Sequence, residues 1–378
     1  MNYERVLFLS FFFFCIHIIS AQQDYKGQIL DSETKEPIPY VNIGVFGKGI
    51  GTVSDEEGRF NLFIDKSKLS TSDVIQFSSI GYKTLKKIVS GLQYVSNEYP
   101  KILMQEESVV LDEVIVTNRG AFEVSDVVGY QNYGEKTFGY WKDNIALGGE
   151  LATKIKVKKG VRRLNTLFFE VFANPSDSVL VRVNIYETGK SRTTVGKKLN
   201  SSNKNILYTI RPGTRLAVVD LTPYSIYIKD DFFVSLELLK VYGDKPIGLV
   251  IAASADKNTY SLGKYASLDK WEQLNHSAMA YHLNTTYFSD SKRAESKVAK
   301  AQKSKKNISG FIFSSRRPLR NIKVTNLTTN QETFSNEKGR YQILGEKDDV
   351  ISFEGKGYKK MTVKLLAKTT VNMNLLRN

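Results

Sequence analysis

The chain has 378 residues, of which 54 are Lys or Arg and 39 are Asp or Glu, so its formal net charge is +15. This positive charge raises the question of a nucleic-acid partner. Neither zinc-finger spacing nor a basic recognition helix accompanies it, so nucleic acid is not expected. The single cysteine excludes an internal disulfide, and the domain cores must therefore be stable through packing alone.

The first 21 residues have the pattern of an export signal. Arg5 precedes an apolar run from Val6 to Ile19, and the small residues Ser20 and Ala21 end it. The run is short for a membrane-spanning helix, so cleavage after residue 21 is expected, with a retained anchor as the alternative. No later stretch is long and apolar enough to predict a transmembrane segment in the mature chain. The expected location is the periplasm, the outer membrane or the medium.

The two ends of the chain carry the same order of β-strand signals. Near the N-terminus, "GQILDSETKEPIPYVNIGV" is followed by "TVSDEEGRFNLFI" and "DVIQFSSIGYKTLKKIV". Near the C-terminus, "SGFIFSSRRPLRNIKVTNL" is followed by "TFSNEKGRYQIL" and "DVISFEGKGYKKMTVKLL". We therefore predict one small β-domain that occurs twice, at residues 22–106 and 307–378.

The acidic stretch at residues 55–57 is interpreted as a hairpin turn rather than a calcium loop. Asp55 and Gly58 of the first copy correspond to Asn336 and Gly339 of the second, so the repeat keeps the turn former and the glycine. The second copy loses most of the negative charge that a calcium site needs. No metal and no cofactor are expected.

The repeated pattern resembles the carboxypeptidase regulatory-like domain. Its elements are a G-x-[IV] start, a proline before an alternating strand, the [ST]-[DN]-x-x-G-x-[FY] hairpin and a later G-[FY]. The resemblance covers residues 24–106 and 307–378 and implies a transthyretin-like β-sandwich of seven strands. It concerns only the accessory part of carboxypeptidases, because no sequence typical of their zinc domain is present.

Residues 107–148 are expected to form a connector. Within them, "SVVLDEVIVTN" at residues 108–118 resembles the segment that joins such a domain to the plug of TonB-dependent outer-membrane transporters of Bacteroidota. Too few residues follow for a transporter barrel of 22 strands. The segment is also compatible with a last sandwich strand and its exit. Residues 119–148, rich in Gly, Tyr and Asn, are predicted to be irregular.

The middle of the chain, residues 149–290, contains seven to nine further strand signals, such as "SVLVRVNIYE" and "DFFVSLELL", without a convincing long helix. We predict a jelly-roll-like β-sandwich there. The complete fold class is therefore all-β, with two small transthyretin-like β-sandwiches flanking a jelly-roll-like one. Residues 291–306 form a basic linker, either helical or disordered.

Aromatic residues are the candidate ligand-binding groups, since jelly rolls often bind sugars through exposed rings. Packing in the core or across strands is the alternative for each of them. The candidates for carbohydrate binding are Trp141, Tyr260, Tyr265 and Trp271.

No catalytic residue is predicted. His276 and His282 lack the H-E-x-x-H pattern of a zinc hydrolase, and adjacent carboxylates such as Asp230 and Asp231 point to opposite faces of a strand. We expect a non-catalytic envelope protein with a binding or scaffolding role for a carbohydrate or an outer-membrane partner. One alternative is an accessory of a TonB-dependent uptake system. The other is a polysaccharide hydrolase whose carboxylates meet only in the folded middle domain.

Overall fold

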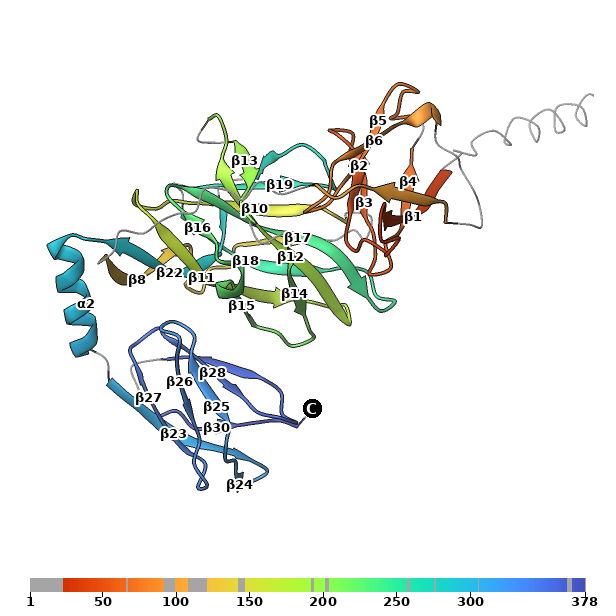
Figure 1. Ribbon diagram of the computed structural model, residues 1–378. Coiled ribbons are helices and arrows are strands. Elements are labelled where there is room, and N and C mark those ends of the chain that lie inside the picture. The colour runs from red at the N-terminus through yellow and green to blue at the C-terminus, as the bar shows by residue number, and fades with distance from the viewer. Residues whose placement is uncertain are drawn as a thin grey trace, which may run out of the picture.

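The computed structural model describes residues 23–65, 67–91, 99–107, 121–141, 147–191, 194–200, 204–256, 259–274, 277–304, 306–365 and 369–377. These ranges form several β-sheets and one α-helix, which confirms the predicted all-β fold class (Figure 1). Within this described part, no helix combines the length and hydropathy needed to cross a bilayer. The expected signal at 1–21 and the segment 108–118 lie outside the described residues.

The N-terminal domain is a sandwich of two sheets with the strand orders β4-β1-β7 and β3-β2-β5-β6. Strand β4 alternates exposed and buried residues, because successive side chains point to opposite faces. The inward side chains, among them Ile29, Phe60 and Phe77, form its core. The strands are β1 (Gln23–Asp31), β2 (Asn42–Val45), β3 (Ile50–Val53), β4 (Arg59–Ile64), β5 (Val74–Ser78), β6 (Leu85–Ile88) and β7 (Lys101–Met104).

The C-terminal domain repeats this arrangement. In the N-terminal domain β1 pairs antiparallel with β4 and parallel with β7, and in the C-terminal domain β23 pairs antiparallel with β27 and parallel with β30. The second sheet has the order β26-β25-β28-β29. The strands are β23 (Lys306–Ser314), β24 (Arg317–Pro318), β25 (Lys323–Asn326), β26 (Gln331–Phe334), β27 (Arg340–Gly345), β28 (Val350–Glu354), β29 (Met361–Lys364) and β30 (Met373–Asn374).

The middle domain contains a seven-stranded sheet, β13-β12-β17-β10-β19-β20 with β14 beside β12, and an eight-stranded sheet. The eight-stranded sheet has the order β21-β18-β11-β22-β8, with β15 and β16 beside β11 and β9 beside β18. Apolar side chains of both sheets, such as Phe169, Val183 and Leu236, share one core. The strands of the two sheets are β8 (Phe122–Gly129), β9 (Phe138–Trp141), β10 (Glu150–Ile155), β11 (Arg162–Ala173), β12 (Ser178–Thr188), β13 (Val195–Lys198), β14 (Ile206–Ile210), β15 (Leu216–Asp220), β16 (Tyr227–Ile228), β17 (Phe232–Tyr242), β18 (Leu249–Ser254), β19 (Ser261–Lys264), β20 (Glu272–Leu274), β21 (Ala278–Met279) and β22 (His282–Ser289).

The part of the expected connector that the structure describes is not irregular. Strand β8 pairs along its whole length with β22, and β9 pairs with β18. Both strands therefore belong to the eight-stranded sheet, and the middle domain reaches back to Phe122. The alternation in "FEVSDVVG" is the local reason for β8, because it gives the strand a buried position at Val124 between exposed ones.

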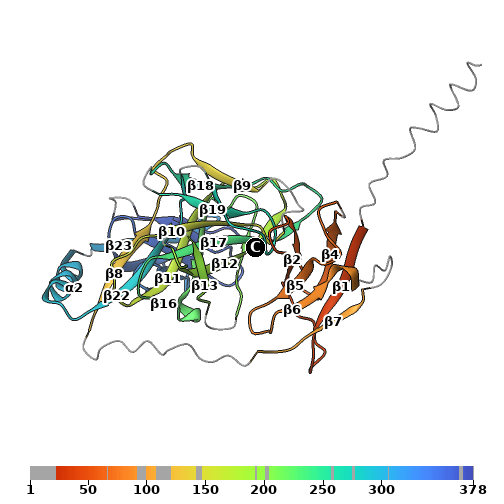
Figure 2. The same cartoon turned by 90° about the horizontal axis from the view of Figure 1, so that it is seen from above.

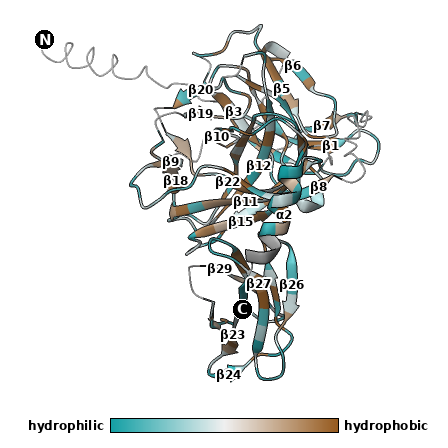
Figure 3. Cartoon of the chain, turned by 90° about the vertical axis from the view of Figure 1, so that its left-hand side faces the viewer, coloured by the Kyte–Doolittle hydropathy of each residue, from teal (hydrophilic) through white to brown (hydrophobic). Residues whose placement is uncertain are grey.

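The basic linker contains helix α2 (Lys292–Ser304), which packs against β8 through the buried Ala294. Figures 1 and 2 place the N-terminal sandwich at one end of the middle domain and α2 at the other, with the C-terminal sandwich following α2. In Figure 3, α2 is coloured mostly as hydrophilic or neutral, whereas hydrophobic colours lie along strands such as β11 and β15.

Candidate functional site between the N-terminal and middle domains

Four charged residues form a row across the outer face of the seven-stranded sheet. Arg182 on β12 lies opposite Glu237 on β17, Glu237 lies opposite Glu150 on β10, and Glu150 lies opposite Lys264 on β19. Along β10, β12 and β17 their apolar neighbours point to the other face and into the core. We call these four residues the ionic row. Its two carboxylates and Arg182 are at most 1% exposed, although ionised side chains are rarely buried unless they are paired.

The charges in the ionic row neutralise one another at hydrogen-bond distance. The guanidinium of Arg182 donates two bonds to the Glu237 carboxylate, Nε to Oε2 at 2.8 Å and Nη2 to Oε1 at 2.7 Å. Lys264 Nζ lies 2.5 Å from Glu150 Oε1. Asn184 lies between the carboxylates and donates to Glu237 Oε2 at 2.8 Å and to Glu150 Oε2 at 3.2 Å. The bidentate arginine pair is the strongest arrangement in this set.

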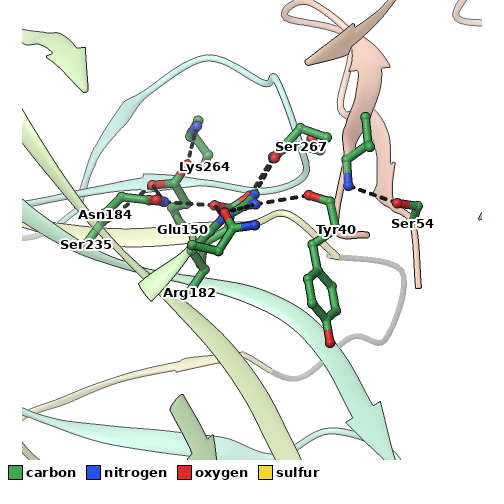
Figure 4. Close-up of polar contacts among 12 residues, drawn as sticks. Tyr40, Ser54, Glu150, Arg182, Asn184, Ser235, Lys264 and Ser267 are labelled. Atoms are coloured by element: carbon green, nitrogen blue, oxygen red, sulfur yellow. Dashed lines mark hydrogen bonds and ion pairs between the residues drawn. The ribbon is translucent and has the colours of Figure 1, made fainter. Parts of the chain in front are cut away.

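The N-terminal domain contacts the ionic row from one side, and Figure 4 shows its Tyr40 beside Arg182. Asn42 on β2 donates to Glu237 Oε1 at 2.5 Å and accepts a hydrogen bond from Arg182 Nη2. Arg182 Nη1 also donates to the backbone oxygen of Tyr40 at 3.0 Å. A second bond from Asn42 reaches Ser267 Oγ at 3.0 Å. The N-terminal domain therefore completes the hydrogen bonds of a charge pair that belongs to the middle domain.

Two glycines allow this close approach. A Cβ atom on Gly44 would lie 2.6 Å from the backbone oxygen of Ser267, and one on Gly51 would lie 2.3 Å from the same oxygen. Any side chain at either position would push the two domains apart. Beside this contact, Lys240 Nζ on β17 lies 2.6 Å from Glu56 Oε2 of the N-terminal domain.

The surroundings of the ionic row shift several pKa values. Burial opposes ionisation of Glu237, but the adjacent Arg182 charge outweighs it and holds the pKa of that carboxyl well below its usual range. Burial lowers the pKa of Lys198 to about 8, and repulsion from Arg182 acts in the same direction. Burial, reinforced by the charge of Glu150, raises the pKa of Tyr186 well above its usual range. Glu237 thus remains ionised and paired with Arg182, an arrangement suited to fixing domain orientation.

A groove lies beside the ionic row, between the N-terminal and middle domains. It has a volume of about 450 Å³ and is lined by residues of β3 and by middle-domain residues such as Leu239. Three aromatic side chains along it are largely exposed: Tyr265 at 48%, Tyr99 at 44% and Phe63 at 53%. Its hydrogen-bonding side chains come from Asp55, Arg59, Asn61 and Lys240.

The four aromatic residues predicted to bind a ligand lie in different environments. Tyr265 lines the groove. Trp271 is partly buried; its ring packs edge-on against Tyr186 at a centroid distance of 6.0 Å and lies 4.5 Å from Lys264 Nζ. Tyr260 is also partly buried in this small cluster. Trp141 is 6% exposed and belongs to the middle core, so its ring has no open face for a sugar.

The residues predicted to form turns occupy equivalent hairpins. Asp55 Oδ1 accepts the amide hydrogens of Glu57 at 3.0 Å and Arg59 at 2.7 Å. Asn336 Oδ1 accepts those of Lys338 at 3.0 Å and Arg340 at 2.9 Å. Such side-chain bonds to the backbone are typical of tight turns opened by Asp or Asn. The side chain of Asp55 is thus engaged with its own turn.

Sequence analysis did not identify the ionic row. The available signal was a charged residue inside an otherwise apolar strand, as in "VLVRVNIYE" and "FFVSLELL", because such a residue must be paired if it is buried. Of the two strand histidines, His282 stacks on Phe168 at a centroid distance of 4.9 Å, and His276 lies outside the described residues.

Comparison with known proteins identifies the N-terminal part. A family model described as a CarboxypepD_reg-like domain matches residues 25–116. TonB-dependent receptor P39 of Formosa agariphila is 31% identical over 124 residues, which are 33% of this chain and 11% of that receptor. TonB-dependent receptor SusC of Bacteroides thetaiotaomicron is 27% identical over 124 residues, again 33% of this chain and 11% of the receptor. The chain thus spans about a tenth of the length of these curated relatives.

Likeness to solved structures is weak. The cysteine protease and lectin-like domains of Cwp84, a surface layer associated protein of Clostridium difficile, align with 41% of this chain and 37% of that chain. The sequence identity is 11% and the TM-score is 0.28, which gives no basis for transferring a fold or a function.

Proposed function

We propose that this protein is an exported, non-catalytic binding protein of a Bacteroidota cell envelope that acts in TonB-dependent uptake and binds carbohydrate in the groove beside Tyr265. The groove carries this proposal. It combines three exposed aromatic rings with amide, guanidinium and ammonium groups. A pyranose ring needs both kinds of group, because its C–H face is apolar and its hydroxyls need hydrogen-bond partners.

The link to uptake is supported by the similarity to TonB-dependent receptors, which falls on about a third of this chain. The shared sheet order supports a second domain of the same family at residues 307–378, since β23, β27 and β30 pair as β1, β4 and β7 do. In this proposal the ionic row holds the N-terminal domain in one orientation, and that orientation gives the groove its shape.

A non-catalytic role is supported by the state of the two carboxylates that the fold brings together. Glu150 and Glu237, distant in sequence, are neighbours in the strand register. Both are buried, each is paired with a cation, and Asn42 covers Glu237. A glycosidase needs its two carboxyl groups on opposite sides of an open cleft that admits the scissile bond.

The groove is tested by measuring carbohydrate binding to wild-type protein and to Tyr265→Ala. A glycan array gives the best ligand, and calorimetry then gives its Kd for both proteins. We expect binding to weaken at least about tenfold in Tyr265→Ala, since the few residues that carry most of the binding energy are enriched in tyrosine and cost about 2 kcal/mol or more when truncated. Phe334→Ala is the matched control, because Phe334 is 59% exposed on β26, outside the groove. Unchanged affinity in Tyr265→Ala would reject the groove as the binding site.

A further inference from the structure

A second aromatic surface lies on β9, away from the groove. Among the described residues β9 pairs only with β18, at an edge of the middle domain (Figure 2). Phe138 and Tyr140 alternate with Gly139 and Trp141 along this strand, so the two pairs face opposite sides. Phe138 is 49% exposed and Tyr140 is 50% exposed, and their ring centroids are 6.2 Å apart.

The packing beneath β9 fixes the direction of these two rings. Trp141 lies in the core, and a Cβ atom on Gly139 would lie 2.5 Å from Met279 Sδ. Turning the strand over would take Trp141 out of the core and would press a new side chain against Met279 and Leu151, so the observed orientation is favoured. Phe138 and Tyr140 thus stay on the outer face, although burying them would remove apolar surface from water.

The loop before β9 is held in place by hydrogen bonds to β18 and the residue after it. Asn132 Nδ2 donates to the backbone oxygen of Ala253 at 2.7 Å and to that of Glu135 at 3.0 Å. The amide of Ala255 donates to Glu135 Oε2 at 2.9 Å. The loop therefore has a defined shape, and a ligand that binds there does not have to order it.

The same loop and strand β11 surround a hollow next to Phe138. Its lining combines polar and aromatic side chains. The polar ones are Asn132, Glu135, Lys136 and Glu170, and the aromatic ones are Phe138 and Phe172. Glu170 is partly buried, and burial raises the pKa of its carboxyl while Lys364 opposes the shift. Two carboxylates and one ammonium give the hollow no net positive charge for an anion, so it suits a neutral occupant with many hydrogen-bonding groups.

We propose that the β9 face, made of Phe138, Tyr140 and the adjoining hollow, is a second carbohydrate-binding surface, for a neutral oligosaccharide. The rings contact the apolar faces of successive sugar units, and Lys136 and Glu170, which line the hollow, bind hydroxyl groups at one end. A partner protein would need a more continuous apolar surface, and an anionic polysaccharide would be repelled by Glu170. The choice of carbohydrate rests on the same chemistry as the proposed function, but the surface is separate from the groove.

The experiment is calorimetric titration of the full-length protein with cellohexaose, xylohexaose and maltohexaose. We compare wild type, Phe138→Ala/Tyr140→Ala, Tyr140→Phe, Tyr265→Ala and Phe334→Ala, after thermal unfolding has shown that each variant is folded. We expect at least one hexasaccharide to bind at least about tenfold more weakly to the double variant. Tyr140→Phe keeps the ring and should retain most of the affinity. Phe334→Ala should bind as wild type does.

The variants separate the two sites. Loss of binding in Phe138→Ala/Tyr140→Ala but not in Tyr265→Ala would support the β9 face as a site separate from the groove. Loss only in Tyr265→Ala would reject the β9 face and leave the proposed function standing. If wild type binds none of the three hexasaccharides at millimolar concentration, the β9 inference is wrong, and the glycan array still tests the groove with other sugars.

Discussion

Arg182 and Glu237 stabilise the contact between the N-terminal and middle domains, because each buried charge needs a partner of opposite charge and hydrogen bonds. Glu237 is fully buried, and its partners come from both domains: Arg182 and Asn184 from the middle domain and Asn42 from the N-terminal domain. An isolated buried carboxylate would cost several kcal/mol of folding free energy. Undocking the N-terminal domain removes one of these partners, so the ionic row favours the docked arrangement.

Replacing Glu237 by Gln tests this argument at the residue scale. The variant keeps the shape of the side chain but leaves the Arg182 guanidinium buried without its counter-charge. We expect the free energy of unfolding to fall by about 3 kcal/mol, measured by urea denaturation. Glu332→Gln is the control, because its ion pair with Lys323 joins side chains that are 45% and 42% exposed. That change should cost less than about 1 kcal/mol. Equal losses in the two variants would contradict a special role for the ionic row.

Single residues of the candidate site were the hardest feature to predict from sequence. The sequence marks Tyr265 only as an aromatic residue of the predicted jelly-roll-like domain, and it lies in the groove. Trp141 had the same sequence signal but faces the core, because its position in β9 relative to Gly139 sets its direction. The partners of Arg182 come from strands that are distant in sequence, so local pattern could not pair them.

At the scale of elements, the hairpin turn of each terminal sandwich depends on one glycine. Gly58 has a φ of 70° and Gly339 has a φ of 70°, a region that residues with a side chain rarely adopt. A Cβ atom would lie 2.4 Å from the backbone oxygen of Ile29 in the first turn. In the second turn it would lie 2.5 Å from that of Ile312. The two domains thus meet the same steric requirement.

Alanine at either turn glycine should destabilise the protein. We expect Gly58→Ala and Gly339→Ala each to lower the free energy of unfolding by about 1–3 kcal/mol, because the alanine is held at positive φ against a carbonyl. Urea denaturation measures both. Gly91→Ala is the control, since a Cβ atom there meets nothing within 4 Å and its φ lies outside the positive range. A turn variant as stable as Gly91→Ala would show that the hairpin tolerates a side chain.

The strands of the terminal domains could be predicted from the sequence. Strands β8 and β9 of the middle domain could not, because they lie in the segment that was predicted to be irregular. Because the same sequence pattern occurs in both terminal domains, each turn could be predicted from two copies of that pattern. Strand β9 has only four residues. Both of its outward residues are aromatic, whereas a half-buried strand with ordinary alternation would have polar residues at those positions. Pattern alone therefore favoured an irregular segment, and pairing with β18 overrides it.

At the scale of the whole molecule, His282 couples stability to pH. It lies on β22 against Phe168, near Lys364 of the C-terminal domain. Burial lowers the pKa of His282 from 6.5 to about 4, and Lys364 adds repulsion. The unfolded chain therefore binds a proton on this side chain below about pH 6.5, while the folded chain does so only near pH 4. Stability falls as the pH drops through this window, because the unfolded state takes up the proton first.

His282→Phe should remove this contribution. Between pH 7 and pH 4 we expect wild type to lose up to about 3 kcal/mol more of its unfolding free energy than the variant does. Phenylalanine can keep the stack on Phe168 without titrating. Urea denaturation of both proteins at the two pH values gives the difference. If both lose the same amount, His282 does not titrate as its burial implies.

Helix α2 sets the relation between the middle domain and the sandwich that follows it. It has 13 residues, is anchored to β8 near its start by Ala294, and precedes β23, which begins at Lys306. Each residue of an α-helix advances the chain by about 1.5 Å and turns it by about 100°. Inserting one residue after Ala294 would hardly change the distance to the C-terminal sandwich, yet it would rotate that domain by more than a quarter turn. The length of α2 therefore sets the angle at which the chain enters the last domain, and a change of that length would work against direct contacts such as the hydrogen bond from Thr166 Oγ1 to the backbone oxygen of Leu327.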